Sequence, residues 1–205
     1  MAILHRAAPC RNVPVTFTLE LMNRRAVATA LVAALAVMPA VASPAFPIPL
    51  KELYAQAHTV AAVEVLEGRV VSVGGESCGA RYKGRVVESM KNASAGATIE
   101  FGYLPQLKVG ASYLVLLGEL RDSAIPNFTE FEARCSGALP PATVVGVWRG
   151  AMEIEGGTGA AEKRTSWTVR PVNYVVYPLG TRTTMVRGEK QLWFTDLVKR
   201  MTAAQ

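Results

Sequence analysis

The chain contains one short motif that has the form of a hydrolase nucleophile site. Residues 75–79 read G-E-S-C-G, which fits G-x-S-x-G with Ser77 at the nucleophile position. That chemistry needs a sharp strand-to-helix turn, an oxyanion hole, and an acid and a histidine later in the chain. Here residues 80–89 read as a strand, and the one histidine beyond residue 42, His58, precedes the serine. We therefore expect the motif to be a chance match in a glycine-rich loop at 74–79. The alternative is an exported hydrolase that uses Ser77 and His58.

Metal and acid–base chemistry have little support in the residue pattern. His58 stands alone, whereas zinc needs three or four clustered ligands. The acid pairs Glu130/Glu132 and Glu153/Glu155 are spaced i, i+2, so on strands each pair shares a face. Glycosidases do use two carboxylates, but charged pairs more often face solvent. The sequence has no phosphate loop, no H-E-x-x-H and no C-x-x-C. We therefore expect no catalytic residues, no cofactor and no metal. In the hydrolase alternative, carboxylates not yet identified could act in place of Ser77 and His58.

The N-terminal region reads as a targeting segment. Residues 22–25 are M-N-R-R, an apolar run follows over 26–38, and residues 40–42 are A-V-A. A basic flank, a short apolar run and a small-residue cleavage site, in that order, indicate a secretory signal peptide at 22–42, with a buried core helix as the alternative. The run is shorter than the roughly 20 residues of a membrane span. Residues 1–21 then read as an extension from a start codon placed too early, and the bacterial protein is expected to be secreted or periplasmic.

Length and charge restrict the classes that remain. Removal of residues 1–42 leaves a length that suits one domain with a real core. The formal net charge of the full chain is +6, and the leader carries four arginines against one glutamate, so about +3 remains. This mild charge is spread along the chain, whereas nucleic-acid binding would show as a clustered basic stripe. The sequence predicts no nucleic-acid partner.

The cysteines predict one crosslink. Cys10 lies in the part that is removed, which leaves Cys78 and Cys135 in an exported protein. A pair of cysteines in an oxidising compartment most often bonds to itself. The closed loop would contribute about 4 kcal/mol through the entropy of the unfolded chain. We therefore expect a Cys78–Cys135 disulfide, and two free thiols are the alternative.

Beyond the leader, a proline-rich linker at 43–50 precedes one β-rich domain at 51–205. Between 59 and 118, β-branched and aromatic runs alternate with glycine-rich breaks, which is typical of an antiparallel meander. Gly68 within the first run predicts a bulge or bend. The expected elements are a helix at 51–58, strands at 59–73, 81–90, 97–103, 112–117, 143–148, 151–155, 165–170 and 173–177, irregular structure at 121–141, a flexible loop at 156–163, and an amphipathic helix at 189–202.

The order of these features resembles a known family. The shared order is a strand, a glycine loop with a cysteine, a strand ending in lysine, a short turn, a strand and then G-x-x-Y-L-V-x-L. In this order the chain is similar to the OB-like barrels of the netrin-module and tissue-inhibitor-of-metalloproteinases type, and more closely to small secreted bacterial proteins with that barrel. The matching residues are 63–73, 78–79, Tyr82, 86–87, Lys91, 99–101 and 110–117. The resemblance implies a mostly β, OB-like antiparallel barrel with its core at about 59–140, a short N-terminal helix and a C-terminal amphipathic helix. The inhibitors chelate zinc through an N-terminal cysteine, and the mature end here, near Ser43, has none.

The resulting functional expectation is a binding role. The chain is predicted to be an exported, non-enzymatic β-barrel module that binds a protein or an envelope component and keeps no membrane span after cleavage. OB-type barrels bind oligonucleotides or oligosaccharides on a sheet face, with exposed aromatic side chains for single strands. The alternation instead predicts Tyr82, Phe101, Tyr103 and Tyr113 in the core. The partner surface is expected in the loops around Cys78, at 121–141 and at 156–163, because loops on rigid scaffolds carry function.

Overall fold

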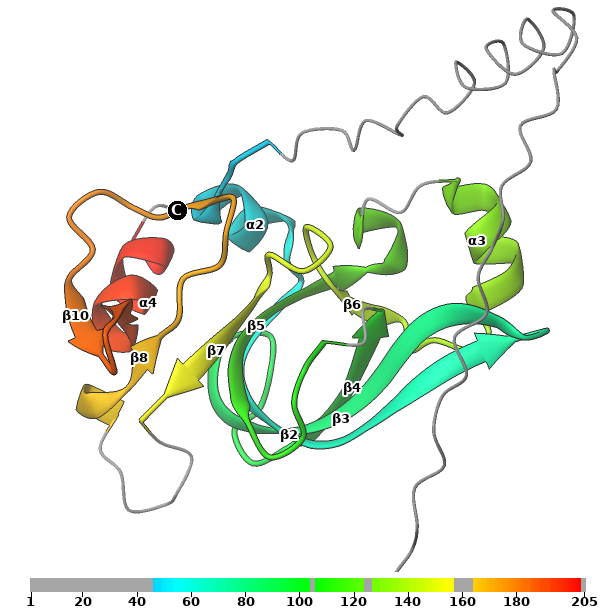
Figure 1. Ribbon diagram of the computed structural model, residues 1–205, viewed down its shortest axis with the longest axis horizontal. Coiled ribbons are helices and arrows are strands. Elements are labelled where there is room, and N and C mark those ends of the chain that lie inside the picture. Colours follow the sequence, from blue (N-terminus) through cyan, green and yellow to red (C-terminus); the bar gives the residue numbers. More distant parts are fainter. Residues whose placement is uncertain (1–45, 104–105, 124–126, 157–163, 204–205) are drawn as a thin grey trace, which may run out of the picture. The chain divides into compact units, whose positions relative to one another are not determined.

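Figure 1 shows the computed structural model, which describes residues 46–103, 106–123, 127–156 and 164–203. These residues belong to one unit, Ala45–Gln205. The predicted extension at 1–21, the signal peptide at 22–42, the start of the linker and nearly all of the loop at 156–163 lie outside the described residues. Among the described residues, no helix has both the length and the apolar character needed to cross a membrane.

The described chain is mostly β, as predicted, with three α-helices and two short 3₁₀ turns. The elements in chain order are β1 (Ile48–Pro49), α2 (Leu50–Gln56), β2 (Thr59–Val73), β3 (Glu76–Lys91), β4 (Thr98–Tyr103), β5 (Ser112–Glu119), η2 (Leu120–Ser123), α3 (Phe128–Cys135), β6 (Ala142–Val144), β7 (Ala151–Glu155), η3 (Arg164–Ser166), β8 (Thr168–Val169), β9 (Val175–Val176), β10 (Thr183–Val186), β11 (Glu189–Trp193) and α4 (Phe194–Thr202).

Nine strands form one sheet in the order β10-β11-β8-β7-β5-β2-β3-β4-β6, and β6 also pairs with β5. The pairings of β5, β2, β3, β4 and β6 therefore return to the strand from which they start. The β4–β6 contact is parallel and joins Gly102 to Thr143, while the β5–β6 contact is antiparallel and joins Leu117 to Val144. A separate parallel pair links β1 to β9.

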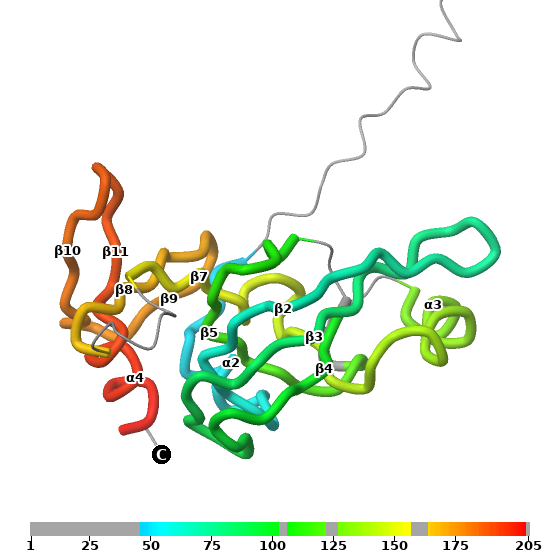
Figure 2. Tube along the Cα trace, turned by 90° about the horizontal axis from the view of Figure 1, so that it is seen from below, coloured from blue at the N-terminus to red at the C-terminus, as the bar shows by residue number. Residues whose placement is uncertain are grey.

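The longest ladder is the hairpin of β2 and β3, which Figures 1 and 2 show running together past α3. Strand β2 has the predicted bounds. Its register shifts at four places, one of them between Val65 and Glu67, beside the glycine that predicted a bulge. The predicted loop at 74–79 is wrong for its last four residues, because Gly74 and Gly75 alone turn the chain with φ of 61° and 85° and β3 begins at Glu76.

Two apolar cores lie on opposite faces of β2 and β5. On β5, Tyr113, Val115 and Leu117 join a cluster with residues of β2, β3, β4 and β6. Leu114 and Leu116 point the other way, into a larger cluster with α2, α4, β7 and β8. Residues of a strand alternate between faces, so a continuous apolar run is stable only where both faces are covered. The predicted strand at 112–117 is confirmed, and its continuous apolar run is buried on both faces.

The helices differ from the predictions at two places. Helix α2 lies where a helix is expected, but α3 falls in the stretch predicted to be irregular, 121–141. The predicted helix at 189–202 is wrong in its first five residues, which form β11. Arg187 and Gly188 both have positive φ, 50° and 84°, as a two-residue hairpin turn requires, and β11 thereby pairs with β10. Burial of Phe194, Leu197, Val198 and Met201 explains the helical spacing of α4.

The remaining strands are shorter than predicted. Strand β7 has its predicted bounds, whereas the strand expected at 143–148 ends at Val144 as β6. It ends there because Gly146 and Val147 both take left-handed backbone conformations, with φ of 62° and 70°, which turn the chain away from the extended direction of the strand. The segments 165–170 and 173–177 keep only two strand residues each, in β8 and β9.

Candidate functional site

The structure does not bring Ser77 and His58 together. Ser77 lies on β3 opposite Ser72, at the tip of the long hairpin. His58 precedes β2, where its backbone N–H donates to the Leu117 carbonyl and its own carbonyl accepts from the Asn92 side chain. The two residues are therefore at opposite ends of β2. Ser77 also sits within a strand and not on a strand-to-helix turn, so the nucleophile elbow is absent at this motif.

The predicted acid pairs have different outcomes. Glu130 and Glu132 lie on α3, so the expectation that they share a strand face is wrong. Glu153 and Glu155 do lie two residues apart on β7, and both bind the Arg170 guanidinium. Within the described ranges, no group of three or more His, Cys, Asp and Glu side chains could hold a metal ion.

The predicted cysteine pair is brought together. The Cys78 and Cys135 sulfurs are 1.97 Å apart, at disulfide distance, with Cα atoms 5.6 Å apart. Cys78 lies on β3 and Cys135 ends α3, so the crosslink ties the hairpin to the helix. Both are buried with Leu139 in a small cluster of their own.

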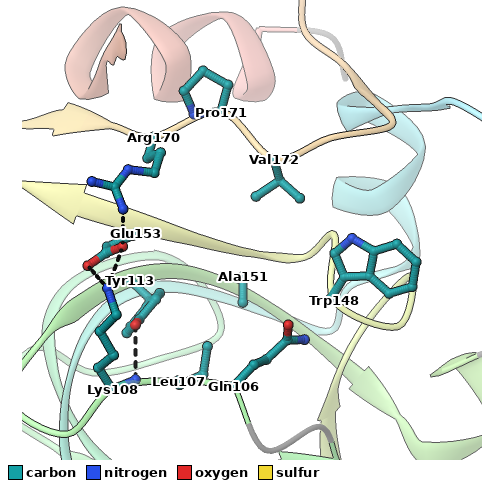
Figure 3. A pocket seen from close by; sticks show the side chains of 10 residues that line it. All are labelled: Gln106, Leu107, Lys108, Tyr113, Trp148, Ala151, Glu153, Arg170, Pro171 and Val172. Carbon is teal, nitrogen blue, oxygen red and sulfur yellow. Dashed lines mark hydrogen bonds and ion pairs between the residues drawn. The ribbon is translucent and has the colours of Figure 1, made fainter. Parts of the chain in front are cut away.

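Glu153 also borders a cavity of about 200 Å³ that the sequence did not predict (Figure 3). An ion-pair bridge closes one end of the cavity and the Trp148 indole lies at the other, with Ala151 between them. Leu107 lies below and Val172 above. The walls come from two irregular segments, 106–108 after β4 and 170–172 after β8, and from β7 and the β6–β7 loop.

The bridge is a chain of charges that meets at Glu153. Lys108 Nζ lies 3.3 Å from Glu153 Oε1, and Arg170 Nη1 lies 2.8 Å from Glu153 Oε2. Arg170 also pairs with Glu155 and, at 3.1 Å, with Glu189 on β11. Partial burial works against its charge, but the three carboxylates raise the pKa of Arg170 above its usual value. Arg170 therefore stays charged at any physiological pH, and the bridge offers both donors and acceptors to the cavity.

Tyrosine hydroxyls fix the backbone of the lower wall. Tyr82 Oη accepts the Leu107 N–H at 3.1 Å, and Tyr113 Oη accepts the Lys108 N–H at 3.0 Å. Both rings are buried, at 4% and 5% exposure, in the core between the strands. Burial raises the pKa of Tyr113, although the Lys108 N–H acts in the opposite direction. The predicted core positions of Tyr82, Tyr113 and the fully buried Phe101 are confirmed, and the Tyr103 side chain lies outside the described residues.

The upper wall is held in the same way. Tyr177 Oη accepts the Val172 N–H at 2.8 Å. Burial raises the pKa of Tyr177 to about 12, against the opposite effect of that N–H. The Arg170 N–H donates to the Glu153 carbonyl at 2.9 Å and attaches the start of this segment to β7. Both irregular walls are thus preorganised by hydrogen bonds to buried tyrosine side chains and to β7.

Trp148 is positioned by a strained loop, 145–150. Leu116 of β5 binds both ends of this loop, since its carbonyl accepts the Val145 N–H and its N–H donates to the Gly150 carbonyl. Val147, with φ of 70°, is a β-branched residue in the left-handed region, which costs of order 1–3 kcal/mol. Such strain is typical of functional positions, and here it presents the indole to the cavity.

Arg149 covers one face of that indole. Its guanidinium carbon lies 4.8 Å from the Trp148 ring centroid, while the residue is 7% exposed. In the described part of the chain its side chain has no hydrogen bond or ion pair, and Nε is buried without a partner. The stacked guanidinium restricts the indole, so the cavity is lined by the part of the ring that Arg149 leaves uncovered.

A second groove, of about 530 Å³, continues from the charged end of the cavity. The two share Lys108, Glu153 and Arg170, and the groove extends toward Thr184 on β10 and Trp193 on β11. The site can therefore take one small group in the cavity and further groups of the same ligand along the groove.

Sequence reasoning missed most of this site. Lys108, Trp148 and Arg170 come from segments read as a loop, a strand and the end of a strand. One signal could have found the indole: Trp148 sits between Gly146 and Gly150, and glycines this close argue against a regular strand. Comparison with known proteins finds no matching family model, curated protein or solved structure.

Proposed function

We propose that this chain is an exported, non-enzymatic binding protein built on an OB-like barrel. The ring of pairings from β5 through β2, β3, β4 and β6 back to β5, filled by its own apolar cluster, supports the barrel. The leader pattern at 22–42 and the pair of cysteines at disulfide distance support export. The barrel acts as the rigid scaffold, and the binding site lies outside it, in the cavity beside Trp148.

The ligand of this cavity is a polyhydroxylated ring, such as one sugar residue of an envelope glycan. The observation that carries this proposal is that Trp148 and the Lys108–Glu153–Arg170 bridge face one cavity from opposite ends. The apolar face of a sugar ring packs against an indole, and its hydroxyls need both donors and acceptors. Lys108 and Arg170 donate, and Glu153 accepts.

The size of the site agrees with such a ligand. Drug-sized ligands occupy about 300–1,000 Å³, and the cavity is smaller, at about 200 Å³. One ring fits inside, and the adjoining groove takes the neighbouring units of a chain. A terminal sugar of a longer glycan therefore suits this surface better than a free, larger metabolite does.

The second candidate is a glycoside hydrolase that uses Glu153 and Glu155. It is favoured by one observation, the position of two carboxylates on the same face of β7 beside the cavity. Arg170 binds both of them, so neither is free to act as a nucleophile or an acid while these ion pairs persist. Binding without turnover accounts for this arrangement better.

The test is an NMR titration that follows the Trp148 indole N–H with hexoses, N-acetylated amino sugars and short glycans made from them. At least one of these sugars should shift the Trp148 signal, and Trp148→Ala should weaken its binding about tenfold or more. The matched control is Tyr174→Ala, because Tyr174 is 50% exposed and does not border the cavity.

Two other outcomes are informative. Equal loss in both variants, or no shift with any sugar, would refute the proposal. Release of a shortened glycan during the titration, abolished by Glu153→Gln, would replace binding with the hydrolase function.

A further inference from the structure

A second surface, on the long hairpin, breaks the charge pattern of its own sheet. The register places Glu64 opposite Arg85 and Glu67 opposite Lys83, and both pairs form ion pairs. The next outward-facing pair along the hairpin is Arg69 opposite Arg81. Like charges directly opposite each other on a sheet are destabilising, so this pair by itself opposes the stability of the hairpin.

Among the described residues, only one of these two arginines makes a direct ion pair. Arg81 pairs with Glu100 on β4, and hydrogen bonding from Arg81 is the main reason that the pKa of Glu100 is lowered. Arg69 is exposed, and among the residues that the structure describes its side chain makes no hydrogen bond or ion pair. Glu100 acts on Arg69 only at longer range, where the charge of Arg69 is the smallest of the causes that lower the pKa of Glu100. Four bases on the hairpin thus face three acids, Glu64 and Glu67 on β2 and Glu100 on β4, which leaves one positive charge in excess.

Arg69 and Arg81 lie at the centre of an elongated groove. A recess of about 340 Å³ extends from them toward Glu67, Lys83 and Glu100. A second recess, of about 370 Å³, extends toward Ser72 and the Gly137–Ala138 segment after α3. We call the two together the Arg69 groove. The Cys78–Cys135 crosslink and an Arg134–Glu76 ion pair hold α3 against the hairpin, so the groove has fixed walls.

We propose that the Arg69 groove binds an extended acidic segment of a protein partner, independently of the cavity beside Trp148. Charge complementarity assigns the occupant: a carboxylate bound beside Arg69 would add a direct ion pair, relieve the repulsion between Arg69 and Arg81, and balance the one excess positive charge. Val71 lies two residues from Arg69 on β2, and so on the same face, and it lines the same groove, where it gives an apolar contact for a neighbouring side chain.

A single-stranded nucleic acid would also be attracted by these charges, but it needs aromatic side chains on which bases stack. The nearest aromatic rings, Tyr82 and Phe101, are buried at 4% and 0% exposure. Among the residues lining the groove, none therefore presents an exposed aromatic ring, and a polypeptide is the occupant that the surface favours.

The test measures binding of a labelled ten-residue glutamate peptide to the full chain by fluorescence anisotropy at low ionic strength. The matched peptide has glutamine at every position, and a ten-nucleotide thymidine strand is the third probe. Arg69→Glu should weaken binding of the glutamate peptide by about tenfold or more, and Arg69→Ala should weaken it less. Lys190→Glu makes the same charge change at an exposed residue of the β10–β11 hairpin and should change binding less than twofold.

The outcomes separate the alternatives. Selective loss in the Arg69 variants, with full binding retained by Trp148→Ala, supports the proposal and shows that it does not depend on the sugar site. The proposal is overturned if the wild-type chain does not prefer the glutamate peptide to the glutamine peptide, or if Arg69→Glu and Lys190→Glu weaken binding equally. Tighter, Arg69-dependent binding of the thymidine strand would assign the groove to nucleic acid instead.

Discussion

Replacement of Tyr177 by phenylalanine tests how the upper wall of the cavity is held. The hydroxyl accepts the Val172 N–H at 2.8 Å, and the variant leaves that N–H without its partner. An unsatisfied group of this kind costs about 1–3 kcal/mol. We therefore expect the free energy of unfolding of Tyr177→Phe to be lower than that of the wild type by this amount at pH 8.

The same residue predicts a pH dependence. Burial raises the pKa of Tyr177 to about 12 in the folded chain, against about 10 in the unfolded chain. A raised pKa stabilises the fold while the phenol is protonated, so this contribution is complete below pH 10 and is lost as the pH rises toward 12. Each pKa unit corresponds to about 1.4 kcal/mol, so about 1.4 kcal/mol is lost by pH 11 and about 2.7 kcal/mol well above pH 12.

The assay is urea unfolding of both proteins at pH 8 and pH 11. Other titrating groups affect the two proteins alike, so the difference between them isolates Tyr177. The difference in free energy of unfolding between the wild type and Tyr177→Phe should be smaller at pH 11 than at pH 8 by about 1.4 kcal/mol. The wild type loses a contribution over this range that the variant never has. A gap that is near zero at pH 8, or that is unchanged at pH 11, would show that Tyr177 does not support the wall in this way.

Two further substitutions test the scaffold. Cys78→Ala with Cys135→Ala should lower the free energy of unfolding by about 4 kcal/mol, as expected for the loop that this bond closes, and a loss below about 1 kcal/mol in denaturant titrations would argue against the crosslink. Gly84→Ala should cost about 1–3 kcal/mol by overpacking the core inside the strand ring, because its Cβ would lie 2.2 Å from Val63 Cγ1. Gly137→Ala, which meets nothing within 4 Å, is the matched control and should be nearly neutral in thermal unfolding.

The elements that sequence reasoning predicted well are those in which local pattern and tertiary burial agree. Strands β2 and β7 have their predicted bounds, and β5 is buried on both faces as its apolar run indicates. The failure at 189–193 has a physical cause. The position of Leu192 in the sequence fits the apolar face of a helix as well as it fits a strand. The Arg187–Gly188 turn pairs β11 with β10, and this pairing makes the segment a strand.

The candidate site could not be predicted because its residues meet only in the folded chain. Lys108 and Arg170 are far apart in sequence and come together because β7 places Glu153 between their two segments. The residues around Trp148 do not indicate in the sequence that Val147 will take a left-handed conformation. It is this conformation that directs the indole toward the cavity. By contrast, Cys78 and Cys135 were predictable, since their pairing depends on the number of cysteines and the compartment more than on geometry.

The central claim is that the cavity between Trp148 and the Lys108–Glu153–Arg170 bridge is a binding site. The most direct measurement is the NMR signal of the Trp148 indole N–H during titration with sugars, assigned by its absence in Trp148→Ala. We predict a saturable shift that Glu153→Gln weakens and Tyr174→Ala leaves unchanged. A Trp148 signal that does not move with any sugar would contradict the account.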